Sequence, residues 1–113
     1  MFHNQSARRE AERLIRLIRQ YWGEKVSNLR IVSLIESPYN MFTLQMQLYK
    51  VYTVNMEYDR STLSIKILID GNFLTLSRVA EEPIFKGFES YRPEKLMHNF
   101  EVLDKTLCTM LQN

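Results

Sequence analysis

Five arginines gather near the beginning of the chain, and they are the first side chains with the chemistry to bind a partner. They are Arg8, Arg9, Arg13, Arg16 and Arg19. A guanidinium group forms bidentate hydrogen bonds with phosphates and carboxylates. Arg9, Arg13 and Arg16 are expected to share one exposed face of a helix. This face either binds nucleic acid, binds an acidic protein, or contacts only solvent, with Glu10 and Glu12 partly neutralising it.

A second group of candidate binding residues lies between positions 80 and 92, in a segment with the composition of a loop. Its aromatic residues recur every three positions, as Phe85, Phe88 and Tyr91. Acidic residues accompany them, namely Glu81, Glu82 and Glu89. Exposed aromatic side chains supply the contact area that anchors protein interfaces. The segment is therefore either a protein-binding loop or a cover that packs over the open end of a sheet.

Groups that could carry catalysis are sparse. The chain has two histidines, His3 and His98, and a single cysteine, Cys108. Cys108 lies ten residues after His98 on one predicted helix, which separates them by about 15 Å along the axis. That distance is too long for a nucleophile and its base. The sequence also lacks metalloprotease, phosphate-loop and dinucleotide-binding motifs. We predict that the protein is not an enzyme and uses neither a metal nor a cofactor.

The arginines lie on a segment predicted to be helical, from Ser6 to Trp22. Its apolar residues fall on one face at 3.6 residues per turn; they are Ala7, Ala11, Leu14, Ile15, Ile18, Tyr21 and Trp22. Ser6 is a suitable N-cap. Gly23 stands where a left-handed residue commonly ends a helix.

From Leu29 onward the apolar residues alternate, which predicts strands. Leu29, Ile31, Ser33 and Ile35 are expected to share one face of the first strand. The alternation then keeps one phase from residue 41 to residue 58, with no Gly or Pro. We interpret residues 41–58 as one long strand with a bulge, although two strands joined near residues 49–50 also fit the pattern.

Turn chemistry divides the remaining strands at residues 37–40, 59–60 and 70–71. Asp70-Gly71 is the strongest hairpin signal in the chain, because both residues tolerate positive φ. These turns predict cross-strand pairs of apolar residues: Ile35 with Phe42, Met56 with Leu63, Ile67 with Leu74, and Ile65 with Leu76. The pairs keep the apolar residues on one side of a meander.

A final helix is expected to open at Pro93, a residue suited to a first helical turn. Its apolar stripe contains Leu96, Phe100, Leu103, Leu107 and Leu111. The predicted fold is therefore α+β: an N-terminal helix, a four-stranded antiparallel meander and a C-terminal helix. Both helices pack on the apolar face of the sheet. We expect residues 1–113 to form a single domain.

Composition narrows the class of protein. The 113 residues are 45% hydrophobic and 25% charged, with a net charge of +2. This total disfavours a general polyanion binder, but it hides a gradient. The net charge is +4 over residues 1–30, zero over residues 31–80 and −2 over residues 81–113. The chain opens without an apolar signal segment, and its apolar runs are too short to span a membrane. These features predict a cytoplasmic protein that does not bind membranes.

The predicted order of elements resembles that of small bacterial immunity proteins, which neutralise a cognate toxin in contact-dependent inhibition and related systems. The resemblance implies a protein that binds its toxin partner without catalysis, and it assigns no residues. Many immunity proteins are acidic, whereas this chain has a pI near 8.8. The resemblance therefore implies either an acidic docking surface on the toxin or recognition through the acidic C-terminal third.

Other functions remain compatible with the sequence. The arginines fit a nucleic-acid-binding module, and the space between helices and sheet fits a small-molecule or lipid pocket. A secretion or assembly chaperone is a further possibility, and an unpaired edge strand fits a homodimer. For a protein partner, the expected binding residues are Arg9, Arg13, Arg16, Glu81, Glu82, Phe85, Phe88 and Tyr91.

Overall fold

The computed structural model describes residues 6–112, so His3 lies outside the described residues. The elements follow in the order α1 (Ala7–Trp22), η1 (Gly23–Lys25), β1 (Val26–Ile35), β2 (Met41–Leu48), β3 (Tyr52–Asp59), β4 (Thr62–Ile69), β5 (Asn72–Thr75), α2 (Leu76–Val79), η2 (Gly87–Tyr91) and α3 (Pro93–Gln112). The predicted α+β class is confirmed, with five strands in place of the expected four.

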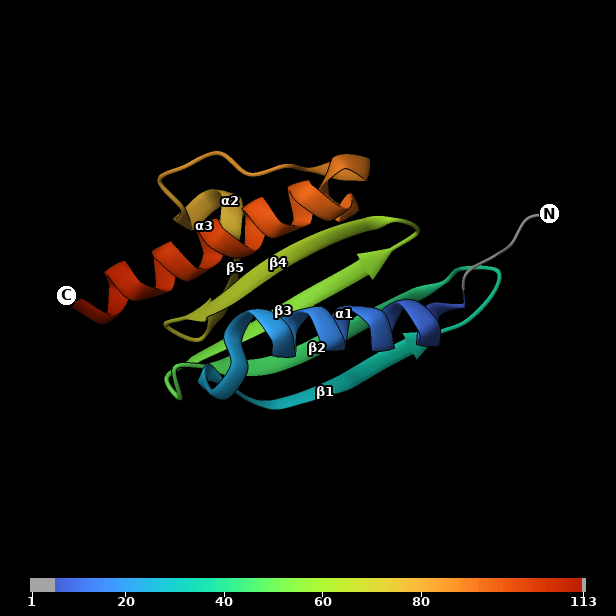
Figure 1. Cartoon of the computed structure of the whole chain (residues 1–113), viewed down its shortest axis with the longest axis horizontal. Helices are drawn as coiled ribbons and strands as arrows, with labels where there is room; N and C mark the ends of the chain where they lie inside the picture. The colour runs from blue at the N-terminus through green and yellow to red at the C-terminus, as the bar shows by residue number, and fades with distance from the viewer. Residues whose placement is uncertain (1–5, 113) are drawn as a thin grey trace.

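The sheet is an antiparallel meander with the strand order β1-β2-β3-β4-β5. Helices α1 and α3 lie side by side on one of its faces (Figure 1). Their apolar stripes and the inward residues of the strands form one core. Trp22 of α1 and Phe100 of α3 touch across the gap between the helices, with ring centroids 4.8 Å apart. The core therefore fixes the two helices relative to each other.

The preferred interpretation of residues 41–58 as one strand is wrong, and the alternative of two strands joined near residues 49–50 is confirmed. Strands β2 and β3 are separated by a tight turn, in which the N–H of Val51 donates to the carbonyl of Leu48 at 3.3 Å. Both central residues have positive φ, 57° at Tyr49 and 61° at Lys50, as in a type I′ turn. Leu48 then pairs with Tyr52. Because Leu48 and Tyr52 are four residues apart, the even-numbered residues face the core both before and after the turn. The alternation of apolar residues therefore continues through the turn and does not reveal it.

A glycine at the second central position of this turn is expected to stabilise the fold. A left-handed conformation costs an L-residue about 1–2 kcal/mol, and glycine avoids this cost but loses more entropy on folding. Lys50→Gly should therefore raise the free energy of unfolding by about 0.5 kcal/mol. Urea denaturation measures the change, with the exposed Lys86→Gly, outside any turn of this type, as a comparison. A lower stability for Lys50→Gly than for the wild type would contradict the turn assignment.

The turn expected at residues 59–60 lies one residue later, at residues 60–61, where φ is 46° and 71°. The register consequently differs by two residues, and Met56 lies opposite Ile65 in place of Leu63. A shift of two residues keeps every side chain on its own face. The predicted core face of β3 and β4 is therefore correct although the predicted pairs are not.

The turn predicted at residues 70–71 is confirmed, with φ of 51° and 82° at its two residues. Ile67 lies opposite Leu74, as expected. The expected pairing of Ile65 with Leu76 is wrong, because the chain leaves the sheet and enters α2 at Leu76. The side chain of Leu76 is nevertheless fully buried. Leaving the sheet this early makes β5 much shorter than the strand beside it.

The predicted inward face of β1 is correct only at its beginning. A bulge interrupts the pairing with β2 between Ile31 and Ser33. After this bulge, the residues predicted to face the core point away from it, and their neighbours face the core. Leu34 consequently lies opposite Phe42 and packs against the core. Ile35, predicted to occupy that position, is 46% exposed.

Candidate functional site

The two groups of candidate residues meet at one point of the structure. Arg13 of α1 lies over the ring of Tyr91, with its guanidinium carbon 5.2 Å from the ring centroid. Both side chains also bind the same carboxylate oxygen, Oε1 of Glu10. Arg13 donates to it at 3.2 Å and the hydroxyl of Tyr91 donates to it at 2.8 Å. We call this three-residue contact the Glu10 tether.

Glu10 can occupy this position because its charge is compensated on several sides. Its side chain is almost entirely buried, with 8% exposed, and a buried carboxylate is costly unless it is paired and hydrogen-bonded. Glu10 also lies in the first turn of α1, where the helix dipole favours a negative charge. The beginning of α1 is itself anchored, because Oε1 of Glu36 accepts a hydrogen bond from the N–H of Ala7 at 2.7 Å.

Behind the tether, the ring of Tyr91 is fixed against the sheet. Its edge contacts Tyr58, with ring centroids 4.9 Å apart, and Tyr58 stacks on Phe42 at 4.7 Å. The preceding residue, Ser90, is buried, and its hydroxyl accepts a hydrogen bond from the N–H of Leu63 at 2.8 Å. Helix η2 is thus attached to β3 and β4 as well as to α1.

The remaining members of this surface flank the tether. Arg9 and Arg16 are exposed, four residues before and three after Arg13 on α1, so they lie one turn to either side of it. Within residues 6–112 neither of them forms an ion pair. Phe88 precedes Tyr91 by three residues in the 3-10 helix η2, where such residues are aligned. Arg9, Arg13, Arg16, Phe88 and Tyr91 form what we call the arginine–aromatic surface.

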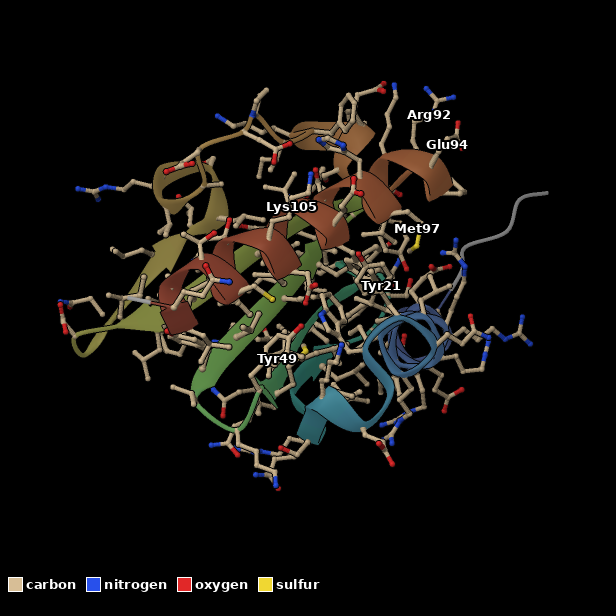
Figure 2. The ribbon with its side chains drawn as sticks, turned by 60° about the vertical axis from the view of Figure 1, so that its left-hand side comes forward. Tyr21, Tyr49, Arg92, Glu94, Met97 and Lys105 are labelled. Atoms are coloured by element: carbon tan, nitrogen blue, oxygen red, sulfur yellow. The ribbon has the colours of Figure 1, made fainter. Side chains whose placement is uncertain are left out.

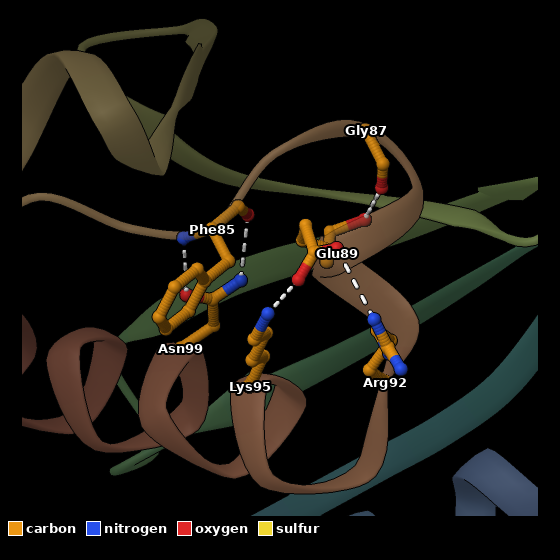
Figure 3. A network of polar contacts seen from close by, with 7 residues as sticks. Phe85, Gly87, Glu89, Arg92, Lys95 and Asn99 are labelled. Carbon is orange, nitrogen blue, oxygen red and sulfur yellow. Dashed lines mark hydrogen bonds and ion pairs between the residues drawn. The ribbon is translucent and has the colours of Figure 1, made fainter.

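Phe85 does not belong to this surface, because it is tied to α3. The side-chain amide of Asn99 bonds both the N–H and the carbonyl of Phe85, each at 2.9 Å (Figure 3). The ring of Phe85 contacts His98 with centroids 5.2 Å apart, and Nζ of Lys95 lies 5.3 Å from its centroid. At Phe85 the segment therefore acts as a cover, whereas at Phe88 it is open to a partner.

Glu81 and Glu82 lie on a different part of the molecule. They border a groove of about 490 Å³ between α2 and the C-terminal half of α3. Oε2 of Glu82 lies 3.5 Å from Nζ of Lys105, which borders the same groove. None of the residues of the arginine–aromatic surface lines this groove. The structure thus separates the acidic candidates from the arginines and from Tyr91.

Two cations that were not among the predicted binding residues, Arg92 and Lys95, pair with Glu89 of η2. Glu89 contacts Lys95, and its other carboxylate oxygen lies 3.4 Å from the guanidinium of Arg92 (Figure 3). The spacing of Glu10 from Arg13 and of Glu89 from Arg92, three residues in each case, is a signal for ion pairs on one helical face. That spacing could have indicated both pairs, although not the contact of Glu10 with Tyr91.

Cys108, which was considered for catalysis, lies in a polar network centred on Asp104. Oδ1 of Asp104 accepts hydrogen bonds from Nε1 of Trp22 at 2.9 Å and from the hydroxyl of Tyr49 at 2.6 Å. Sγ of Cys108 lies 3.5 Å from the same hydroxyl. Figure 2 shows Tyr49 beside the C-terminal half of α3, away from Arg92 at its beginning. This network joins α1, the β2–β3 turn and α3.

Among residues 6–112, the His, Cys, Asp and Glu side chains form no group of three or more that could hold a metal ion. None of the helices in this part of the chain has both the length and the apolar character needed to cross a membrane.

Comparison with known proteins does not identify a family. No protein-family description matches the chain, and neither a curated protein nor a solved structure is similar enough to count as a match.

Removing the hydroxyl of Tyr91 tests the Glu10 tether. Tyr91→Phe should lower the free energy of unfolding by about 1–2 kcal/mol, because the carboxylate of Glu10 stays buried and loses a hydrogen bond. Tyr39→Phe serves as the control, since Tyr39 is 58% exposed. Urea denaturation near neutral pH measures both variants. Equal stabilities of Tyr91→Phe and the wild type would show that the tether contributes nothing.

The same variant should change the dependence of stability on pH. Burial and the hydrogen bond to Glu10 raise the pKa of Tyr91 above its ordinary value of 10.0. Above about pH 10 the unfolded chain therefore loses this proton while the folded chain keeps it, and stability falls as the pH rises. Tyr91→Phe should show a shallower fall than the wild type when unfolding is measured between about pH 9 and pH 11. A parallel pair of curves would contradict the burial of this hydroxyl.

Proposed function

We propose that the protein is a non-catalytic binding module that recognises a protein partner through the arginine–aromatic surface. Specifically, we propose an immunity protein that acts in the cytoplasm and covers the active site of a cognate toxin. Arginine and tyrosine are enriched among the residues that dominate protein interfaces. This surface carries both residue types on two elements that the core holds in place.

The Glu10 tether is the observation that carries this proposal. It fixes the guanidinium of Arg13 and the ring of Tyr91 before any partner arrives. A side chain that is already ordered loses less conformational entropy on binding, which increases affinity.

The charge of the surface indicates the charge of the partner. Arg9 and Arg16 are exposed on either side of the tether, and the tether itself already contains a carboxylate to pair with Arg13. Within the arginine–aromatic surface, the cations that form no ion pair with residues 6–112 are thus those of Arg9 and Arg16. Complementary charge raises the rate of association and selects the partner, so we propose an acidic docking surface on the toxin.

Purification with the product of the neighbouring gene tests this function. The tagged protein and that product are expressed together, purified through the tag and separated by size. The expected result is a stable complex, together with inhibition that is complete once the two proteins are equimolar in an assay of the product's activity. Separate elution of the two proteins, with full activity of the product at any ratio, would overturn the proposal.

A nucleic-acid-binding module is the second candidate, because α1 exposes four arginines: Arg8, Arg9, Arg16 and Arg19. The uncovered sheet face supports it less. On this face Arg30 donates to Gln45 at 2.7 Å and Gln45 donates to Asn55 at 3.0 Å. RNA-binding sheets, in contrast, commonly present aromatic side chains on which bases stack. If nucleic acid were the ligand, affinity for labelled DNA and RNA oligonucleotides would fall steeply between about 50 and 200 mM salt. It would also fall in Arg9→Ala/Arg16→Ala.

A further inference from the structure

Phe88 is the most exposed large hydrophobic side chain among the described residues, at 74%. Its position in η2 is nevertheless well fixed. The hydroxyl of Ser90 donates to the carbonyl of Gly87 and accepts the N–H of Leu63. The bond to Gly87 closes the turn that carries Phe88, and the bond from Leu63 attaches this turn to β4. The ring therefore projects from a rigid turn, although the core does not use it.

Cations surround this ring. Lys86 lies two residues before Phe88 and is exposed. Arg92, just before α3, and Lys95, in the first turn of α3, both contact Glu89 (Figure 3). Arg13 reaches the same region from α1, since it lies over Tyr91. Of the three carboxylates of this region, Glu10 and Glu89 are paired with these cations, and the third is the exposed Glu94 in the first turn of α3 (Figure 2). The four cations still outnumber them. The surroundings of Phe88 are therefore positive overall.

From this arrangement we infer that Phe88 is the anchor of the interface, and that it enters an apolar pocket of the partner bordered by carboxylates. The inference rests on the proposed function and specifies the chemistry of the partner. An exposed aromatic ring gains most when a pocket removes it from water. The cations around it require acidic groups on the opposite side, because like charges facing each other would oppose binding.

An anionic membrane also offers negative charge and an apolar interior, but the structure favours a protein partner. Only one large apolar side chain of η2 is strongly exposed. Even a myristoyl chain, which buries far more apolar surface, gives only marginal membrane binding. A protein pocket of matching shape would bury more of the surface of this single fixed ring.

The test compares two phenylalanines that are both exposed. Phe88→Ala removes the proposed anchor, and Phe73→Ala removes a ring that is 40% exposed on β5. Calorimetric titration with the purified product of the neighbouring gene measures the dissociation constant of each variant. Phe88→Ala should weaken binding about 100-fold, and Phe73→Ala should bind as the wild type does. Thermal unfolding should be nearly unchanged in both, since neither ring is part of the core.

The other possible results distinguish a failure of this inference from a failure of the proposed function. Equal binding by wild type and Phe88→Ala would overturn the anchor and leave the proposed function intact. A wild type that does not bind the product at all would overturn both. Vesicles of phosphatidylserine and phosphatidylcholine are tested in parallel by sedimentation. Binding of the wild type to these vesicles, lost in Phe88→Ala, would overturn the protein pocket in favour of a membrane surface.

Discussion

Reversing the charges of Arg9 and Arg16 is expected to weaken binding to the partner at least about 100-fold, or about 2.8 kcal/mol. Both side chains are exposed and lie on either side of the Glu10 tether. In Arg9→Glu/Arg16→Glu, two attractions become two repulsions against an acidic docking surface. Arg13 is left in place, so that the loss reports on charge and not on the tether. Titration calorimetry with the product of the neighbouring gene measures the effect.

A control with the same change of charge separates local contact from overall electrostatics. Arg60→Glu/Arg78→Glu alters two exposed arginines outside the arginine–aromatic surface, on the β3–β4 turn and on α2. This variant has the same net charge as the first, and it should bind nearly as tightly as the wild type. A similar loss of affinity in both variants would show that the total charge of the protein causes the effect. It would contradict binding at α1.

Replacing Trp22 by alanine is expected to lower the free energy of unfolding by about 3–5 kcal/mol. Its side chain is 4% exposed and contacts Phe100 of α3. Its ring N–H also donates to Asp104 at 2.9 Å. The substitution thus removes both the packing and a hydrogen bond that hold α1 against α3.

A second substitution divides this effect into its parts. Trp22→Phe keeps most of the packing and loses the hydrogen bond to Asp104, so we expect a loss of about 1–2 kcal/mol. Leu111→Ala, at a position that is 42% exposed, should change stability much less. Urea denaturation followed by circular dichroism measures all three, since Trp22 is the single tryptophan and its fluorescence disappears with it. A Trp22→Ala variant as stable as Leu111→Ala would contradict the role of this contact.

The helices could be predicted from the sequence because their signals are local. The apolar period of α1 and the cap at Ser6, which accepts the N–H of Arg9 at 3.1 Å, are contained within the segment itself. The same holds for α3, which begins at Pro93 as predicted. The turn at Asp70-Gly71 was also predictable, because its residue types tolerate positive φ.

The β2–β3 turn could be predicted only as an alternative to one long strand, because local signals do not favour it. Its left-handed residues, Tyr49 and Lys50, are types that seldom adopt positive φ. Contacts distant in sequence support them: the N–H of Tyr49 donates to the carbonyl of Lys25 at 2.9 Å, and its hydroxyl donates to Asp104 at 2.6 Å. Such tertiary contacts outweigh local preference, and a pattern of alternating residues does not show them.

The candidate site was predictable only in pieces. Both groups that contain Arg13 and Tyr91 were visible as clusters of binding residues. Their contact was not, because Glu10 and Tyr91 are 81 residues apart in the chain. The aromatic period of three also grouped Phe85 with Phe88, although the side chain of Asn99 ties Phe85 to α3. Which residues of a loop face a partner depends on these tertiary bonds.

Hydrogen–deuterium exchange of the complex with the product of the neighbouring gene would locate the binding surface most directly. Free and bound protein are compared segment by segment after digestion. If the arginine–aromatic surface binds the partner, exchange should slow in the bound state over residues 8–16 of α1 and residues 86–92 around η2. The strands of the uncovered sheet face and the groove beside Glu81 and Glu82 should exchange as in the free protein. Protection confined to that sheet face or to that groove, with none at α1 and η2, would contradict the proposed interface.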